Sequence, residues 1–303
     1  MQVTDPEVLR FIADTEAAYP AEANGATAQD NRRMYDAMCA VFRAPRPAGL
    51  PVCDESVAGV PVRRYTPDGA HARPFLLYSH GGGFVVGGLD SHDDVCAELA
   101  VATGCEVISV DYRLAPEYLF PAQIDDVAAV WCVEAADGRQ GIAVGDSAGG
   151  NLSAGLCFRM RRTGGPMPLA QVLIYPGLGG DMDAPSYIDN AEAPMLRTQD
   201  LKAYAGMLTG GDMELSRSNP EISPLVAQSF AGLPPAFIVT ADVDPLRDDG
   251  PAYLKALQAE GIAAQWRNEP QLIHGYLRAR HSSARAGESF RAICNWINAL
   301  LAR

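Results

Sequence analysis

Apolar and polar positions along the chain group into blocks that predict strands and helices in turn. Short apolar runs bounded by turn residues are typical of buried strands, whereas apolar residues three and four positions apart are typical of amphipathic helices. We expect strands at residues 60–67, 75–79, 106–112, 141–144, 171–176, 236–241 and 263–268. We expect helices at residues 6–18, 30–43, 91–103, 121–135, 150–160, 198–208, 245–260 and 283–302. This alternation predicts an α/β fold with a mostly parallel sheet flanked by helices on both faces.

Two segments stand apart from the alternation. The expected helix at residues 30–43 has one apolar stripe, formed by Met34, Met38, Val41 and Phe42. Prolines end the pattern at residues 45–51, so residues 1–50 form a separate helical segment, either a flap over the core or an ordinary packed helix pair. Residues 178–218 interrupt the pattern with glycines and prolines. We expect them to be an insertion that joins the N-terminal helices as a cap over a core at residues 51–303.

Composition narrows the classes of partner. The chain has 303 residues, of which 48% are hydrophobic, and this is ample for a buried core. Its net charge of −13 would repel nucleic acid and anionic membranes, so we expect neither as a partner. We see no signal peptide and no membrane-spanning run. The seven cysteines show no metal-binding spacing, which favours reduced thiols and a cytoplasmic location.

Residues 145–149 read Gly-Asp-Ser-Ala-Gly and lie between an expected buried strand and an expected helix. A serine at such a turn is held in a strained backbone conformation that exposes its hydroxyl above the sheet. Glycines flank it because the neighbouring backbone leaves no room for side chains. The helix that follows directs free N–H groups toward Ser147, and these favour negative charge. A glycine-rich turn with a capping serine is the alternative explanation for this motif.

A nucleophilic serine needs a base, and the base needs a carboxylate that orients it. His274 follows the last expected strand at the carboxyl edge of the sheet, so it is the preferred base, with a buried structural histidine as the alternative. Asp244 ends a strand and opens a helix, so it is the preferred carboxylate. An aspartate before a proline is also a common helix cap, and Asp242 is the second candidate.

Donors for an oxyanion are the remaining requirement of acyl transfer. Residues 80–84 read His-Gly-Gly-Gly-Phe directly after a buried strand, and the glycines leave their N–H groups unobstructed. Ala148, which follows the candidate nucleophile, supplies another N–H group. A flexible turn is the alternative explanation for three consecutive glycines.

Five motifs occur in a fixed order along about residues 60–280. They are residues 80–84, residues 111–117 (Asp-Tyr-Arg-Leu-Ala-Pro-Glu), residues 145–150, residues 244–248 (Asp-Pro-Leu-Arg-Asp) and residues 274–276 (His-Gly-Tyr). Together they resemble the bacterial hormone-sensitive-lipase family of esterases, in its Gly-Asp-Ser-Ala-Gly branch. The resemblance implies an α/β-hydrolase fold with a helical cap and no metal or cofactor. It places the nucleophile on Ser147, the acid on Asp244, the base on His274 and the oxyanion donors on the N–H groups of Gly82, Gly83 and Ala148.

The resemblance implies a serine carboxylesterase that acts through an acyl-enzyme on a small-molecule ester. The cap and Phe84 would enclose an apolar pocket, hence short to medium acyl chains. Alternatives with the same triad are an amidase or an acyltransferase. A non-catalytic small-molecule receptor on the same fold is a further alternative, but such receptors typically lose a triad member. Residues 263–268 could pair at a sheet edge in a homodimer. Arg113 and Glu117 are expected to support a loop rather than to act in catalysis.

Overall fold

The core is a single eight-stranded sheet in a computed structural model that describes residues 2–19 and 27–302. The strands are β1 Val52–Val57, β2 Val60–Tyr65, β3 Phe75–Ser79, β4 Val107–Val110, β5 Gly141–Asp146, β6 Ala170–Ile174, β7 Ala236–Val243 and β8 Ala264–Ile273. Their order in the sheet is β1-β2-β4-β3-β5-β6-β7-β8. Strand β2 pairs antiparallel with β1 and β4, and the neighbouring pairs from β4 to β8 are parallel. The prediction of a mostly parallel α/β sheet is therefore confirmed.

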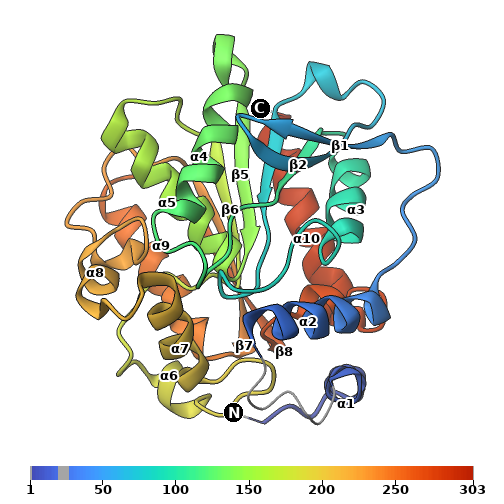
Figure 1. Cartoon of the computed structure of the whole chain (residues 1–303), viewed down its shortest axis with the longest axis vertical. Helices are drawn as coiled ribbons and strands as arrows, with labels where there is room; N and C mark the ends of the chain where they lie inside the picture. Colours follow the sequence, from blue (N-terminus) through green and yellow to red (C-terminus); the bar gives the residue numbers. More distant parts are fainter. Residues whose placement is uncertain (1, 20–26, 303) are drawn as a thin grey trace.

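Helices cover both faces of the sheet. The helices are α1 Pro6–Ala18, α2 Ala28–Phe42, α3 Asp93–Thr103, α4 Ala122–Glu134, α5 Ala148–Thr163, α6 Pro185–Asp189, α7 Thr198–Thr209, α8 Met213–Ser218, α9 Asp249–Ala259 and α10 Ala284–Leu301. Helices α4, α5 and α9 pack on one face, and α3 and α10 pack on the other (Figure 1). Helices α1, α2, α6 and α7 gather at the lower end of the molecule in Figure 1, beside the labelled ends of β7 and β8.

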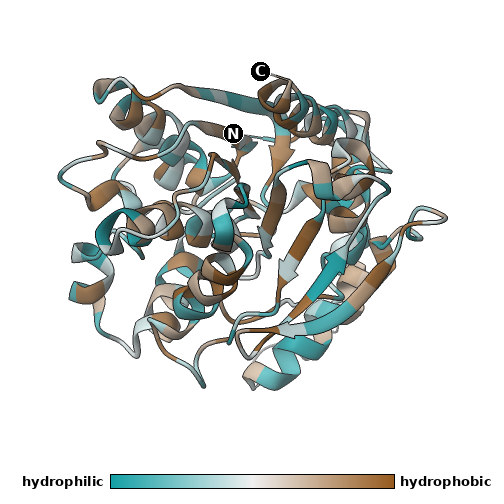
Figure 2. Cartoon of the chain, turned by 90° about the horizontal axis from the view of Figure 1, so that it is seen from above, coloured by the Kyte–Doolittle hydropathy of each residue, from teal (hydrophilic) through white to brown (hydrophobic). Residues whose placement is uncertain are grey.

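Alternate residues of the central strands fill two separate hydrophobic cores. On β3, Leu76 and Tyr78 belong to the core under α3 and α10, whereas Phe75 and Leu77 belong to the core under α4 and α5. Figure 2 shows the central strands as predominantly hydrophobic, while the surrounding helices carry both colours. Burial of each such large side chain stabilises the fold by about 1.5–3 kcal/mol. The sheet is therefore a rigid base whose carboxyl edge can position functional groups.

The structure corrects some predictions. Strand β1 was not predicted because four of its residues are exposed, which removes the apolar alternation. Strand β8 runs five residues beyond its predicted end, to Ile273. The predicted apolar stripe of α2 is wrong at Val41, which is 62% exposed. The buried face of α2 is formed instead by Tyr35, Met38 and Cys39.

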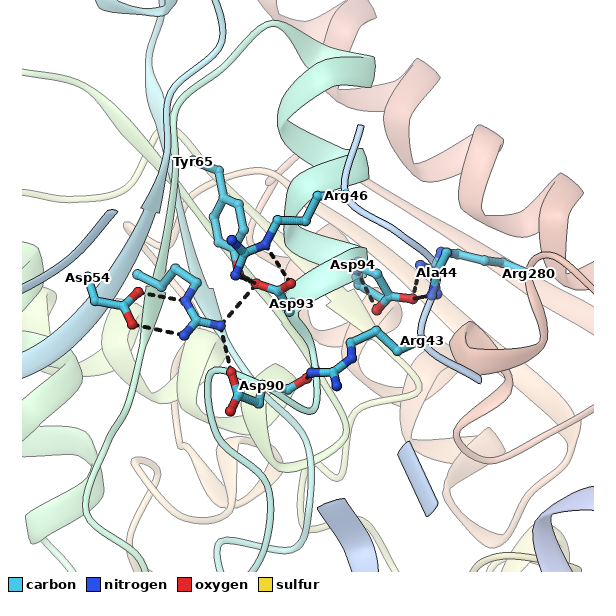
Figure 3. Close-up of polar contacts among 11 residues, drawn as sticks. Arg43, Ala44, Arg46, Asp54, Tyr65, Asp90, Asp93, Asp94 and Arg280 are labelled. Atoms are coloured by element: carbon cyan, nitrogen blue, oxygen red, sulfur yellow. Dashed lines mark hydrogen bonds and ion pairs between the residues drawn. The ribbon is translucent and has the colours of Figure 1, made fainter. Parts of the chain in front are cut away.

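An ion-pair network fixes the segment that leads from α2 into β1 (Figure 3). It includes Arg43, Ala44, Arg46, Asp54, Arg63, Tyr65, Asp90, Asp93, Asp94 and Arg280. The buried carboxylate of Asp93 accepts hydrogen bonds from Arg46 at 2.7 Å and from Arg63 at 3.0 Å. Burial raises the pKa of Asp93, but these donors outweigh it and leave the pKa below its ordinary value. The segment that follows α2 is thus attached at a defined position on the core.

Candidate active site

Ser147 lies in the sharp turn between β5 and α5. Its backbone has φ 54° and ψ −118°, a strained region for a residue with a side chain. The turn is crowded: a Cβ atom on Gly145 would lie 2.2 Å from the carbonyl oxygen of Gly149. A Cβ atom on Gly149 would lie 1.8 Å from the carbonyl oxygen of Ser79. Both glycines of the motif are therefore required by close backbone approach, as the sequence predicts.

A continuous hydrogen-bond chain joins Ser147 to His274 and Asp244. The Nε2 atom of His274 is 2.8 Å from Oγ of Ser147, and its Nδ1 atom is 2.7 Å from Oδ2 of Asp244. A carboxylate only accepts hydrogen bonds, so Nδ1 carries the ring hydrogen and Nε2 can accept the serine proton. Asp244 follows β7 and His274 follows β8, and the carboxyl ends of these parallel neighbours meet at one edge of the sheet. The arrangement can generate a nucleophilic alkoxide from Ser147.

Asp244 has two functions that the sequence left as alternatives. Its carboxylate is fully buried, and the second oxygen, Oδ1, accepts a hydrogen bond from the N–H of Leu246 at 2.9 Å. It thereby caps the short helix η5, Pro245–Asp248, while it orients His274. The second candidate, Asp242, accepts instead from the amide of Asn268 at 3.0 Å. The aspartate that contacts His274 is thus Asp244 and not Asp242.

The three residues that the sequence proposes as oxyanion donors lie in the wall of one cavity. Gly82, Gly83 and Ala148 line the same cavity as Ser147. Gly82 has φ 122°, and a Cβ atom there would lie 2.1 Å from the carbonyl oxygen of Val86, so only glycine fits. Ala148 is the first residue of α5, so its N–H has no partner within the helix. Within residues 2–19 and 27–302, no group accepts a hydrogen bond from the N–H of Gly82 or Gly83. The N–H groups of Gly82 and Gly83 are therefore not used in hydrogen bonds among the described residues.

A buried polar network supports the glycine loop from behind, and the sequence did not predict it. The carboxylate of Asp146 accepts hydrogen bonds from Gly81 N–H at 3.0 Å and from the Tyr78 hydroxyl at 2.8 Å. The Nε2 atom of His92 is 3.3 Å from the same carboxylate. Burial raises the pKa of Asp146, but His92 and Tyr78 outweigh it and hold the pKa well below its usual range. The only sign of this network in the sequence is the charged residue Asp146 between an apolar strand and the small residues of the turn.

The remaining histidines have other roles. Burial lowers the pKa of His80 to about 3, so its ring is neutral. Its Nδ1 atom is 2.8 Å from the carbonyl oxygen of Gly81, which can only accept, so the hydrogen lies on Nδ1. His71 and His281 are exposed, and His281 pairs with Glu98 at 2.7 Å. None of these contacts the serine.

The cavity in front of Ser147 has a volume of about 1490 Å³. Its walls come from the core and also from α1, α2, α7 and α8. Phe84 lines it, as do apolar residues that include Met38, Leu196, Leu201, Met207, Leu208 and Leu246. A largely apolar cavity with a few convergent polar groups is the usual form of a small-molecule site.

Arg113 and Glu117 do not pair with each other. Arg113 forms an ion pair with Asp126 at 2.8 Å, and Glu117 forms one with Arg32 of α2. Neither residue lines the cavity, in agreement with a supporting role. Within the described ranges, no cluster of three His, Cys, Asp or Glu side chains is placed to hold a metal ion. No helix in the same ranges is long and apolar enough to cross a bilayer.

Comparison with known proteins identifies the family of the chain. A family model described as the alpha/beta hydrolase fold matches residues 76–278. Carboxylesterase NlhH of Mycobacterium tuberculosis is 43% identical over 232 residues, which are 74% of this chain and 73% of that protein. Ethyl acetate hydrolase of Pseudomonas putida is 33% identical over 294 residues, covering 90% of this chain and 92% of that protein.

Solved structures extend the likeness to nearly the whole chain. The crystal structure of an esterase from the bacterial hormone-sensitive lipase family superposes with a TM-score of 0.90 and 28% identity. The match covers 99% of this chain and 100% of that structure. The chain therefore belongs to the α/β hydrolase family, as a carboxylic ester hydrolase of the bacterial hormone-sensitive-lipase-like group.

Proposed function

We propose that the protein hydrolyses short- to medium-chain acyl esters through a covalent acyl-enzyme on Ser147. The observation that carries this proposal is the hydrogen-bond chain from Asp244 through His274 to Ser147, with distances of 2.7 and 2.8 Å. It ends at the wall of a largely apolar cavity. A retained triad speaks against a non-catalytic receptor on this fold.

The first half-reaction forms the acyl-enzyme. Nε2 of His274 takes the proton of Ser147 while Oγ bonds to the ester carbonyl carbon. The carbonyl oxygen becomes an oxyanion that accepts hydrogen bonds from the N–H groups of Gly82, Gly83 and Ala148. Each such donor stabilises the transition state by about 3 kcal/mol. His274 then gives its proton to the departing alkoxide, and the bond between the carbonyl carbon and the alkoxy oxygen breaks.

The second half-reaction releases the acid. Water attacks the acyl group with His274 again as base, the oxyanion forms in the same place, and Ser147 leaves as the protonated hydroxyl. Asp244 keeps the imidazole in the required tautomer and stabilises its positive charge during both steps. The chain's own groups thus account for the whole reaction.

The acyl-chain preference rests on the cavity. Residues 1–50 and 178–218 are proposed to form a cap over the core at residues 51–303, because helices from both segments line the cavity. Phe84, on the glycine loop, would contact the substrate. The relative named ethyl acetate hydrolase is consistent with small esters. The homodimer through β8 and the cytoplasmic location stay predictions.

The direct test compares wild type, Ser147→Ala and the control Ser153→Ala on p-nitrophenyl esters from acetate to palmitate. Ser153 lies on the same helix, but its hydroxyl bonds to the carbonyl of Gly149. We expect Ser147→Ala to lose about 10⁴-fold or more in kcat and Ser153→Ala to remain active. Equal activity of Ser147→Ala and wild type would contradict the proposal. Amide substrates and added alcohols in the same assay distinguish an amidase or an acyltransferase.

A further inference from the structure

Arg278 lies in the wall of the active-site cavity and, among the residues that the structure describes, forms no ion pair with a carboxylate. It lies in the short helix η6, Tyr276–Ala279, and lines the cavity together with Ser147 and His274. Within the described ranges, no Asp or Glu oxygen is within 4 Å of its guanidinium. The buried carboxylate of Asp146 lines the same cavity, and the charge of Arg278 contributes to the low pKa of that carboxyl group from beyond ion-pair distance. Its buried Nε atom has no hydrogen-bond partner in those ranges.

The contacts of Arg278 are aromatic and phenolic. Its Nη1 atom donates a hydrogen bond to the Tyr35 hydroxyl at 3.1 Å, and its guanidinium lies 5.3 Å from the centre of the Tyr35 ring. Tyr35 belongs to the buried face of α2. A single phenol oxygen can accept from one or two of the five guanidinium N–H groups, so the others have no acceptor among the residues that the structure describes. Among the described residues, the guanidinium therefore has a phenol hydroxyl as its hydrogen-bond partner and a carboxylate, Asp146, only at longer range.

Arg278 is also close to the catalytic base. A Cβ atom on Gly275, the residue after His274, would lie 3.0 Å from Nη2 of Arg278. The guanidinium thus borders the backbone of the loop that carries the base. A substrate group bound to Arg278 would therefore lie beside the loop that carries His274.

A partly buried guanidinium favours one kind of ligand. Its planar fork matches a carboxylate in a bidentate pair, and charge-assisted bonds of this type are about twice as strong as neutral ones. Removing a cation from water without a close counter-ion is costly, so an anion that enters the cavity and pairs with the partly buried Arg278 relieves this cost. The net charge of −13 repels anions at long range, so recognition of an anion has to come from a local cation.

We propose that Arg278 binds a carboxylate group carried by the substrate, so that the enzyme selects esters with a free carboxylate, such as monoalkyl esters of dicarboxylic acids. This inference rests on the proposed ester hydrolysis at Ser147 and names its substrate class. The carboxylate replaces Tyr35 as the principal partner of the guanidinium while the ester carbonyl reaches Ser147.

The experiment uses monoethyl glutarate and its neutral amide, which have nearly the same shape and differ in charge. We expect wild type to have the higher kcat/KM for monoethyl glutarate. Arg278→Met should reduce the preference for the acid over the amide by about 10–100-fold, the loss of a charged hydrogen-bond pair. Arg278→Lys should restore part of that preference. The control Arg291→Met changes the net charge equally at an exposed site on α10 and should leave the preference unchanged.

Two results would overturn the inference. One is a wild-type enzyme that does not prefer the acid over the amide. The other is an Arg278→Met enzyme, folded by circular dichroism, that loses activity on both substrates equally, because this would make Arg278 a structural contact to Tyr35 only.

Calorimetry separates this inference from the proposed hydrolysis. The Ser147→Ala enzyme should bind monoethyl glutarate more tightly than the amide, and the double variant with Arg278→Met should not. Equal affinities in Ser147→Ala would contradict the inference even if esters are hydrolysed. Inactivity of wild type on every ester, with selective binding retained, would contradict the proposed function alone.

Discussion

Two aspartates at the end of β7 differ sharply in what they contact. Asp244 bonds to His274 at 2.7 Å, whereas Asp242 bonds to Asn268 at 3.0 Å. We expect Asp244→Asn to lower kcat by about 10⁴-fold, because an amide in place of the carboxylate favours the wrong histidine tautomer. Asp242→Asn should retain most of the activity. Steady-state kinetics on a p-nitrophenyl ester measure both.

Melting temperatures show whether a loss of activity in either aspartate variant is caused by unfolding. The oxygen of an asparagine at position 244 can still accept from Leu246 N–H, so the melting temperature should change little. An Asp242→Asn enzyme that loses as much activity as Asp244→Asn would show that the assignment of the acid is wrong.

Sequence and structure agree on the positions of the residues that belong to a local motif. Ser147, Asp244 and His274 each follow a strand, and parallel strands bring such positions to one edge. Arg278 could not be assigned in this way, because the proposal for it depends on which described side chains surround its guanidinium in the folded chain. Its one sequence signal is a charged residue in the apolar stretch that follows the histidine motif.

At the scale of elements, α2 is attached to the core through Arg32. Its Nε atom donates to the carbonyl of Val85 at 2.8 Å, and its Nη2 atom donates to the carbonyl of Ala115 at 2.8 Å. We expect Arg32→Met to weaken the docking of α2 by about 1–3 kcal/mol, because two carbonyls lose a charged donor. Hydrogen exchange of α2 amides should accelerate, and KM should rise.

Arg33→Met is the matched control for this element. Arg33 is the next residue, and its side chain pairs with Asp30 on the same helix. Its replacement should leave both hydrogen exchange and KM near the wild-type values. Indistinguishable exchange in the two variants would show that Arg32 does not hold the helix.

The elements that the sequence did not predict lack a visible apolar period, for two different reasons. Strand β1 is an exposed edge strand held by pairing with β2, in which Asp54 lies opposite Arg63 and Glu55 bonds across to Arg64. Such cross-strand charge pairs stabilise a strand without apolar alternation. Helices α6 and α8 have five and six residues, too short for a helical period to be visible in sequence. The long, buried elements were predicted because their periodicity is set by the core.

At the scale of the whole molecule, one buried carboxyl group links stability to pH. Burial raises the pKa of Asp249 to about 6. Its carboxyl accepts hydrogen bonds from Leu178 N–H at 2.7 Å and from the Tyr187 hydroxyl at 2.8 Å. In the unfolded chain the group titrates near its ordinary value of about 3.9. Its stabilising contribution is therefore complete below that value and is lost as the pH rises through 6.

Asp249→Asn isolates this contribution, because the amide stays neutral at every pH. We expect the free energy of unfolding of wild type, relative to Asp249→Asn, to fall by up to about 3 kcal/mol between pH 4 and pH 7.5. Urea unfolding of dilute protein measures this difference. A difference that does not vary with pH would show that the folded-state pKa is not raised.

The proposed catalytic residues and much of the cavity wall come from different parts of the chain. Ser147, Asp244 and His274 follow strands of the sheet, whereas much of the lining comes from α1, α2, α7 and α8. Substitutions in these helices can therefore change which molecules enter the cavity. They need not alter the three residues that we propose carry out the reaction. A change of substrate preference in such an enzyme therefore requires substitutions in the lining helices only.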